Sequence, residues 1–438
     1  MKANNMNMKS IIECLSKETF IIKSSEDRYI VSLPLRGKAF FASAYGAETL
    51  LNVLGGSAME VDNQVEDYLK ELYDMPSLTP AIKSREGVFS SAISLILTQR
   101  CNFECTYCFA HDARGKETMT QEDVAFIIDS WAAEPIPHQK VTFIGGGEPT
   151  IVWDLLEWAI KYVRKKLGDV KIVLVTNGSL ISHDRLLFLR DAKVQISLSF
   201  DILPEIQEGQ RRIYHSGKSS FKAVDTFIRD VIQTNAGTEK SDVIRVGIRS
   251  TITPDIVEKM TDMVRFVDEN YRGTVKQIHF EHVTSSSNPG AFYHQYEEEF
   301  FKARAFGREV GIEVCNSITA SQGKVRNSFC LGESCFVPTD DDGIICTACH
   351  RISSPRDGLI DVFKYAEARG HKMFHFKEAT NESLRGNSED CNTCPAKWQC
   401  AGGCIMERLL LSPELLEKKC EMVRGFNRRL LEEKLDEQ

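Results

Sequence analysis

The sequence predicts an α/β protein: a partial (β/α)6 TIM-like barrel between a small N-terminal α+β unit and a cysteine-rich C-terminal extension. Six apolar, strand-like segments alternate with helical segments between about residues 90 and 285, which is typical of a parallel sheet. The chain has 438 residues and is 42% hydrophobic, enough for a large core and about two or three domains. Nine of its 14 cysteines lie from Cys330 onward, where hydrophobic periodicity is weak.

Residues 1–85 are expected to form the small α+β unit. Short apolar strands are followed by segments with apolar residues at helical spacing, and a polar, proline-containing stretch from 75 to 86 ends the unit. The expected strands are Thr19–Lys23 and Tyr29–Ser32, which are followed by a further apolar stretch around Ala39–Ala42. The expected helices are Ala47–Leu54 and Val65–Tyr73.

Residues 86–290 are expected to form the barrel, closed or partly closed. The expected strands are Ala92–Leu97, Val141–Ile144, Ile172–Thr176, Val194–Phe200, Val243–Ile252 and Gln277–Val283. The expected helices are Gln121–Ala133, Ile151–Lys166, His183–Asp191, Phe221–Gln233 and Pro254–Tyr271. Ligands of such folds bind at the carboxyl ends of the strands, so chemistry is expected in the loops that follow them.

Residues 291–438 are expected to form the cysteine-rich extension. After about residue 325 the segments are short and rich in Cys, Gly and Asp. Such a region lacks the periodic apolar residues of an ordinary core, and metal clusters could hold it together. The charged stretch Pro413–Lys434 predicts a final helix with one packed stripe.

Charge and composition exclude several classes of function. The chain has 54 Lys and Arg against 62 Asp and Glu, a net charge of −8, which argues against binding nucleic acid through phosphates. No apolar run approaches the roughly 18 residues of a membrane-spanning helix. The N-terminus does not resemble a signal peptide, so a cytoplasmic location is expected. In that setting 14 cysteines indicate metal or redox chemistry and not disulfides.

The first cysteine motif, CNFECTYC, directly follows the first barrel strand. Thiolates of Cys101, Cys105 and Cys108 at this spacing can bind three irons of a 4Fe–4S cluster and leave the fourth iron open for an external ligand. A three-cysteine zinc site completed by His111 is the alternative.

With its neighbouring motifs, this segment resembles the radical S-adenosylmethionine (radical SAM) superfamily. An aromatic residue, Tyr107, precedes the last cysteine, and the second strand ends in a Gly-Gly-Glu motif, Gly146-Gly147-Glu148, within GGGEP. Glycines permit close backbone approach, and a carboxylate can receive an ammonium group. The resemblance implies that SAM chelates the open iron, that its reduction releases a 5′-deoxyadenosyl radical, and that these residues bind the cofactor.

Three further residues are assigned to SAM by the same resemblance. Asn177 ends the third strand, and Ser199 and Arg211 match a family segment that contacts SAM. Asn177-Gly178 is also an ordinary turn, and Arg211 could be a surface residue beside Arg212. This sequence departs from the family where Ile202 replaces a glycine and Gln207 replaces a histidine.

The C-terminal cysteines resemble the SPASM extension of radical SAM peptide and protein maturases, although CxxC pairs alone would also suit zinc ribbons. The family's CX2CX5CX3C core is present in CNTCPAKWQCAGGC, residues 391–404. The resemblance implies two auxiliary 4Fe–4S clusters. Their ligands would be Cys330, Cys335, Cys349 and Cys404 for the first, and Cys391, Cys394, Cys400 and Cys420 for the second. Cys346 is an alternative to Cys349; Cys14 and Cys315 receive no role.

The residue after Cys349 bears on the substrate. Anaerobic sulfatase maturases, which share this architecture, have an Asp proton acceptor there, whereas this chain has His350. A histidine can accept a proton, so His350 is the candidate catalytic residue, with a structural role as the alternative.

The resemblance implies a maturase of ribosomally made peptides that forms a thioether or carbon–carbon cross-link. Oxidation of Cys or Ser in a protein, as in sulfatase maturases, is the second interpretation, and a zinc-binding interaction protein is the third. Expected partners are a peptide or protein substrate and a reductant such as flavodoxin or ferredoxin. Residues 1–85 either bind a leader peptide at a strand edge or simply cap the barrel.

Overall fold

The computed structural model describes residues 7–57, 62–79, 89–111, 115–239, 242–326, 329, 333–338, 344–347, 362–368, 371–376 and 389–438. The chain divides into two compact units, considered one at a time. The first combines Met1–Lys83 with Ser317–Phe329 and Glu382–Gln438; the second combines Ser84–Asn316 with Cys330–Asn381. The division into segments 1–85, 86–290 and 291–438 remains a prediction.

The second unit is built on a sheet whose strand order is β12-β11-β10-β8-β7-β6-β4-β13-β14-β16-β15. The strands from β12 to β13 are all parallel to their neighbours. They are β4 (Ala92–Leu95), β6 (Lys140–Phe143), β7 (Lys171–Thr176), β8 (Val194–Ser199), β10 (Val246–Ile252), β11 (Val275–His282), β12 (Glu313–Cys315) and β13 (Glu333–Pro338). This sheet confirms the predicted partial barrel, and β12 and β13 lengthen it at its two ends.

Beyond β13 the sheet continues with strands of mixed direction. Antiparallel pairing joins β13 to β14 (Ile344–Thr347), and β14 runs parallel to β16 (His371–Phe376), which pairs antiparallel with β15 (Val362–Ala368). A separate two-stranded sheet pairs β5 (Phe103–Cys105) with β9 (Arg211–Ile213).

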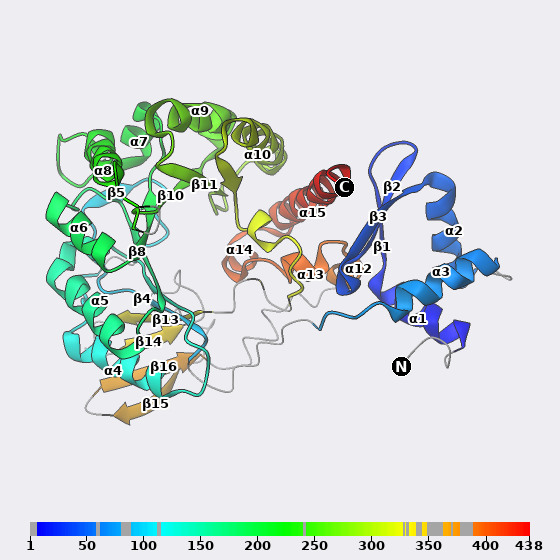
Figure 1. The fold of residues 1–438 in the computed structure, drawn as a ribbon, viewed down its shortest axis with the longest axis horizontal. Coiled ribbons are helices and arrows are strands. Elements are labelled where there is room, and N and C mark those ends of the chain that lie inside the picture. Colours follow the sequence, from blue (N-terminus) through cyan, green and yellow to red (C-terminus); the bar gives the residue numbers. More distant parts are fainter. Residues whose placement is uncertain are drawn as a thin grey trace. The chain divides into compact units, whose positions relative to one another are not determined.

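Helices connect the parallel strands and lie along the outer side of the sheet (Figure 1). They are α4 (Gln121–Ala133), η3 (Pro149–Val152), α5 (Trp153–Leu167), α6 (His183–Asp191), α7 (Pro204–Gln210), α8 (Ser220–Asn235), η4 (Pro254–Lys259), α9 (Met260–Tyr271) and α10 (Ala291–Val310). Local sequence explains their ends. Thr120 and Asp123 form a capping box at the start of α4, and Gly311, at φ 76°, ends α10 in the left-handed conformation that glycine favours.

The two faces of the strands differ in character. The side chains of Leu198 in β8 and Phe227 in α8 both lie close to Gly178, and the ring of His282 in β11 contacts Tyr293 of α10. Leu198, His282 and the residues that alternate with the same parity along their strands therefore face the helices. These residues are largely apolar and buried. Residues of the opposite parity, such as Ser199 and Arg249, lie on the inner face. Along these strands, inner-face polar residues therefore alternate with apolar residues that face the helices. The inner face is therefore available for a polar site.

The first unit contains an antiparallel sheet in the order β1-β2-β3, made of Phe20–Lys23, Arg28–Leu33 and Lys38–Ser43. The short η2 (Pro34–Arg36) joins β2 to β3, and α1 (Met8–Glu18), α2 (Ala44–Leu54) and α3 (Asn63–Asp74) surround a core that includes Ile11, Val31 and Leu69. These elements confirm the strands and helices predicted before residue 75.

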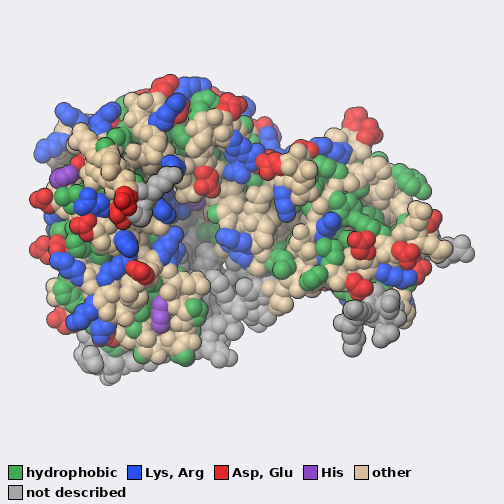
Figure 2. Space-filling model, viewed as in Figure 1, with side chains coloured by type: hydrophobic (Ala, Val, Ile, Leu, Met, Phe, Trp, Pro, Cys, Tyr) green, Lys and Arg blue, Asp and Glu red, His purple; other side chains and the backbone are tan. Residues whose placement is uncertain are grey.

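Four C-terminal helices and η5 (Thr319–Ser321) also belong to the first unit: α12 (Glu389–Thr393), α13 (Lys397–Cys400), α14 (Ile405–Leu410) and α15 (Pro413–Asp436). Residues of α15 contact β2 and β3, and Ser24 Oγ donates to Glu432 at 2.6 Å. The space-filling view in Figure 2 shows charged side chains of both signs spread over the surface that faces the viewer. Within the described part of the chain, no helix is both long and apolar enough to cross a membrane.

Candidate functional site

The first cysteine motif follows β4 and is held by the segment around β9. Cys105 pairs with Arg211 in the antiparallel β5–β9 sheet. On either side, Thr106 N donates to Gln210 O at 2.9 Å and Tyr214 N donates to Asn102 O at 2.8 Å. Residues more than 100 positions apart therefore fix the cysteine loop beside the end of the barrel.

The three thiols of this motif lie together. Burial raises the pKa of Cys105 to about 12; the nearby Arg211 opposes the shift, and charge on Cys101 and Cys108 adds to it. Neighbouring thiolates repel one another unless a cation or metal compensates them. These residues therefore fit three corners of a 4Fe–4S cluster, whose irons would stabilise the thiolates.

A mononuclear metal site is not formed in the part of the chain that the structure describes. No three His, Cys, Asp or Glu side chains converge there as one metal ion would require. The zinc alternative, with His111 as fourth ligand, stays a prediction. Thiolates of a 4Fe–4S cluster each bind a different iron and need not converge on one point.

The glycine motif packs tightly against the residues that precede the cysteines. Gly147 N donates to Thr98 O at 3.1 Å, and Glu148 N donates to Arg100 O at 2.8 Å. A Cβ atom at Gly147 would come within 1.9 Å of the Arg100 carbonyl oxygen. Only glycine permits this approach, which sets the position of the loop after β6.

The Glu148 carboxylate is buried and connects this loop to the end of β7. Its Oε1 accepts hydrogen bonds from Thr150 N at 3.1 Å, Thr150 Oγ1 at 2.6 Å and Thr176 Oγ1 at 2.7 Å, and its Oε2 accepts from Asn177 N at 2.7 Å. Burial raises the pKa of Glu148, and these hydrogen bonds oppose the shift. Binding of the SAM ammonium here stays a prediction.

Asn177 is also buried and engaged with the cysteine loop. Its Nδ2 donates to Asn102 Oδ1 at 2.9 Å, and its Oδ1 accepts from Ser179 N at 3.0 Å and Ser179 Oγ at 2.7 Å. Asn177-Gly178 is thus a turn, with Gly178 at φ 74°. The same turn also holds Asn102 of the cysteine loop in place through its hydrogen bond from Asn177. Its contact with SAM remains a prediction.

Tyr107 and Arg211, both assigned to the cofactor, meet at Asp201, which is completely buried. Tyr107 Oη donates to Asp201 Oδ2 at 2.6 Å and Arg211 Nε donates to the same oxygen at 3.0 Å. Ser250 Oγ and Thr251 N each donate to Oδ1 at 3.1 Å. Burial disfavours the positive charge of Arg211, but the Asp201 carboxylate outweighs this effect and raises the pKa of Arg211. The ion pair therefore persists.

This geometry corrects one alternative. Arg211 is not a surface residue, because it is 8% exposed and its guanidinium lies over the Tyr107 ring at 5.3 Å. The pair links the cysteine loop to the ends of β8 and β10. A cofactor contact by Tyr107 or Arg211 is untested by these contacts and remains a prediction.

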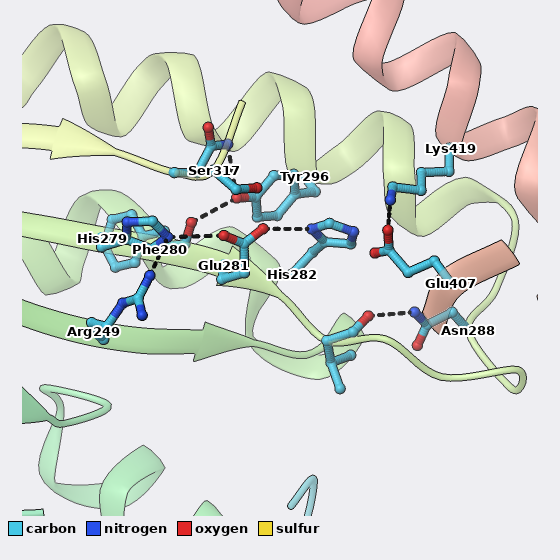
Figure 3. A network of polar contacts seen from close by, with 12 residues as sticks. Arg249, His279, Phe280, Glu281, His282, Asn288, Tyr296, Ser317, Glu407 and Lys419 are labelled. Carbon is cyan, nitrogen blue, oxygen red and sulfur yellow. Dashed lines mark hydrogen bonds and ion pairs between the residues drawn. The ribbon is translucent and has the colours of Figure 1, made fainter. Parts of the chain in front are cut away.

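Ser199 lies half-buried at the end of β8, on the inner face. It is in register with Arg249 of β10, which is in register with His279 of β11, which is in register with Cys315 of β12. Figure 3 shows Arg249, His279, Glu281 and Tyr296 gathered in one polar network. The sequence analysis missed this group. Its signal was the alternation of His279 and Glu281 with the buried residues Ile278 and Phe280 in β11.

Four predicted ligands of the second auxiliary cluster come together in the first unit. Burial raises the pKa of Cys400 to about 11, Lys419 opposes this shift, and charge on Cys420, Cys394 and Cys391 adds to it. Arg408 Nη2 also lies 3.7 Å from Cys391 Sγ. Thiols this close, flanked by cations, fit a cluster site.

The remaining predicted ligands are described only in part. Cys335 is buried in β13 and Cys404 precedes α14, while Cys346 is buried in β14 opposite Phe336. Cys330, Cys349 and His350 lie outside the described residues. The choice between Cys346 and Cys349, the first auxiliary cluster and the role of His350 all stay predictions.

The first cysteine motif, the glycine motif, Asn177, Ser199 and Arg211 fall within one segment that matches a known family. Residues 95–267, from the end of β4 into α9, match the model of the radical SAM superfamily. The chain contains a radical SAM domain. The predicted membership of this enzyme superfamily is confirmed for that domain, which implies a 4Fe–4S cluster and SAM as its cofactors.

Solved structures share the fold of this chain at low sequence identity. Native anSMEcpe with bound AdoMet has a TM-score of 0.58 and 18% identity over 78% of this chain and 99% of that one. SuiB of Streptococcus suis bound to its precursor peptide SuiA has a TM-score of 0.50 and 13% identity over 90% of this chain and 95% of that one.

Curated relatives carry different activities. A probable GTP 3′,8-cyclase of Methanocaldococcus jannaschii is 23% identical over 287 residues, 64% of this chain and 86% of that protein. A cysteine-type anaerobic sulfatase-maturating enzyme of Clostridium perfringens is 26% identical over 179 residues, 39% of this chain and 46% of that protein. The reaction catalysed by this chain therefore has to be argued from its own residues.

Proposed function

We propose that this radical SAM enzyme modifies a side chain of a ribosomally made peptide and forms a thioether or carbon–carbon cross-link. The observation that carries the proposal is the second thiol group, Cys391, Cys394, Cys400 and Cys420. A radical SAM site alone needs three cysteines, and a further complete set of four suits an enzyme that removes electrons from its substrate.

In the proposal, each described site residue has a task. Cys101, Cys105 and Cys108 hold the cluster that, with SAM bound, supplies the hydrogen-abstracting 5′-deoxyadenosyl radical. Glu148 and Asn177 keep the loops after β6 and β7 in place around it, where SAM would bind. The Asp201–Arg211 pair holds the cysteine loop from the other side and excludes water by its burial.

The substrate class is supported by two neighbours in fold. Native anSMEcpe was solved with bound AdoMet and the Cp18Cys peptide, and SuiB with the peptide SuiA. In the proposal, residues 1–85 bind a leader peptide along an edge of the β1-β2-β3 sheet, where backbone groups pair with an added strand. A flavodoxin or ferredoxin supplies the electron.

A second candidate is oxidation of Cys or Ser in a protein, favoured by the similarity to the sulfatase-maturating enzyme. Cross-linking yields a product lighter by two hydrogen atoms that keeps every heavy atom. Formylglycine formation yields an aldehyde, which a hydrazide probe captures. Tandem mass spectrometry of the treated peptide separates these two products.

The test is anaerobic reconstitution followed by incubation with SAM, dithionite and a peptide. We expect about twelve irons per chain for three 4Fe–4S clusters, and 5′-deoxyadenosine in step with a cross-linked peptide. The substrates to compare are short peptides encoded beside the gene, a sulfatase-derived Cys peptide and GTP. Stoichiometric zinc with no iron chromophore would support an interaction protein instead, and conversion of GTP alone would contradict peptide modification.

A further inference from the structure

The inner face of the barrel carries a second group of polar residues beside the predicted SAM contacts. Ser199, Arg249, His279 and Cys315 occupy matching positions on β8, β10, β11 and β12, so they form one row across four adjacent strands. Glu281 lies two positions after His279 on the same face of β11. The row leads from the expected cofactor position toward the β12 end of the sheet.

The contacts of His279 favour one tautomer of its ring (Figure 3). Its Nε2 lies 2.8 Å from Glu281 Oε2 and 3.4 Å from Arg249 Nη2. Because the carboxylate contact is the shorter one, Nε2–H donates to Glu281. The neutral ring then keeps its lone pair on Nδ1, which lies 3.8 Å from Cys315 Sγ.

Glu281 is the group that fixes this arrangement. Burial disfavours its charge, but hydrogen bonds from His279 and from His282, whose Nδ1 lies 3.3 Å from Oε1, hold the pKa of the Glu281 carboxyl well below its usual range. An anion hydrogen-bonded to Nε2–H stabilises the ring when Nδ1 takes up a proton. The side chain of His279 remains 14% exposed.

Cys315 leaves Nδ1 accessible to a stronger donor. Burial raises the pKa of the Cys315 thiol to about 12, so the thiol is neutral. A thiol is a weak hydrogen-bond donor, and its contact with Nδ1 is readily exchanged for one from a substrate. The other charged or titratable groups of this region are Arg249 from β10, which lies beside the ring, Glu313 from β12 and Arg304 from α10, which lie near Cys315, and Tyr296 from α10, which lies near Glu281.

We propose that His279 is a proton acceptor for the substrate, positioned by Glu281, on the wall of the barrel next to the SAM site. The inference rests on the proposed function and names a catalytic residue for it. It differs from the candidate suggested by the sequence, His350, because it comes from β11 of the barrel and not from the cysteine-rich extension.

The chemistry requires such an acceptor. Once a hydrogen atom has been removed from a substrate carbon, forming the new bond to a substrate thiol also requires the loss of one electron and one proton. The electron goes to a one-electron acceptor of the iron–sulfur class. The proton leaves the thiol for Nδ1 of His279, which becomes an imidazolium hydrogen-bonded to Glu281. The product then has one new C–S bond in place of one C–H and one S–H bond.

The first experiment needs no peptide substrate. The holoenzyme is treated anaerobically with diethyl pyrocarbonate, which attacks unprotonated ring nitrogens, and modification of each histidine is followed by mass spectrometry between pH 5 and 8. In Glu281→Gln the neutral amide no longer stabilises the protonated ring. The modification rate of His279 is therefore expected to rise severalfold in the variant.

The exposed pair His183–Asp230, also 2.8 Å apart, provides the matched control. Asp230→Asn should change the modification of His183 and leave His279 unaffected. If the pH dependence of His279 is the same in wild type and Glu281→Gln, the proposal is overturned. This outcome does not depend on whether the peptide substrate is correct.

The second experiment measures cross-linked product per 5′-deoxyadenosine on a synthetic peptide with a central cysteine. His279→Gln should still cleave SAM but lose roughly 100-fold in product per cleavage, whereas His183→Gln should behave as wild type. Glu281→Gln should shift the acidic limb of the product pH profile, which a purely structural role would not do. Full product yield with His279→Gln overturns the proposal. If wild-type enzyme cleaves SAM and modifies no peptide, the proposed function fails, and the labelling experiment alone decides the proton acceptor.

Discussion

Ile202 provides a direct test of how the site loop after β8 is built. It is completely buried, yet its backbone has φ 65°, in the left-handed region. This region costs an L-residue about 1–2 kcal/mol, and a β-branched side chain is a particularly unusual occupant. The family segment that this chain resembles has glycine there. The buried side chain must therefore offset the backbone cost.

Comparing two substitutions separates these effects. Ile202→Ala removes buried atoms, at a cost of about 2–5 kcal/mol, but keeps the unfavourable backbone conformation. Ile202→Gly loses the same packing and relieves the backbone. We expect the glycine variant to be more stable than the alanine variant by about 1 kcal/mol, although glycine in a regular element is less stable than alanine by about 0.5–1 kcal/mol.

The assay is urea unfolding under anaerobic conditions, comparing midpoints among variants with equal slopes. Ile248 is the matched control, because it is buried in β10 and is not among the residues with positive φ. The difference in urea midpoint between the glycine and the alanine variant should be positive at position 202 and negative at position 248. If glycine is the less stable residue at both positions, the argument from backbone strain is refuted.

Three other outcomes follow from the site. Asp201→Asn should cost about 3–5 kcal/mol of unfolding free energy, measured by urea, because the buried Arg211 loses its counter-charge; a cost below about 1 kcal/mol would contradict the pair's role. Gly147→Ala should abolish 5′-deoxyadenosine formation through its clash with the loop, whereas Gly209→Ala, which has open space at its Cβ, should retain it; equal activities would contradict the loop geometry. Because the pKa of Glu281 is lowered, the carboxylate stabilises the fold above its ordinary value of 4.5, and this contribution is lost as pH falls below it. The stability advantage of wild type over Glu281→Gln should accordingly shrink in urea titrations below pH 4.5, and an advantage that grows there would contradict the sign of the shift.

Much of the barrel was predictable because its signals are local. Gln121–Ala133 and His183–Asp191 match their predicted bounds, since each helix begins directly after a capping Thr or Ser. The cysteine and glycine motifs were located correctly at the ends of β4 and β6 for a similar reason: apolar strands followed by motif residues mark the carboxyl edge.

Long-range relations were not predictable from one sequence. The pairing of β5 with β9 joins residues about 100 positions apart, and β13 adds to the sheet beside β4 from far along the chain. The burial of Arg211 depends on Asp201, Tyr107 and the β5–β9 pairing together. Likewise, Arg249, His279 and Cys315 become one group only through the register of three strands, which a linear pattern does not contain.

The central claim is that Cys101, Cys105 and Cys108 hold the cluster that cleaves SAM. The most direct measurement is iron content together with 5′-deoxyadenosine formation in reconstituted wild type and Cys105→Ala, with Cys14→Ala as control. Our account predicts that Cys105→Ala loses about four irons and all SAM cleavage, while Cys14→Ala retains both. SAM cleavage by Cys105→Ala at the wild-type rate would contradict it.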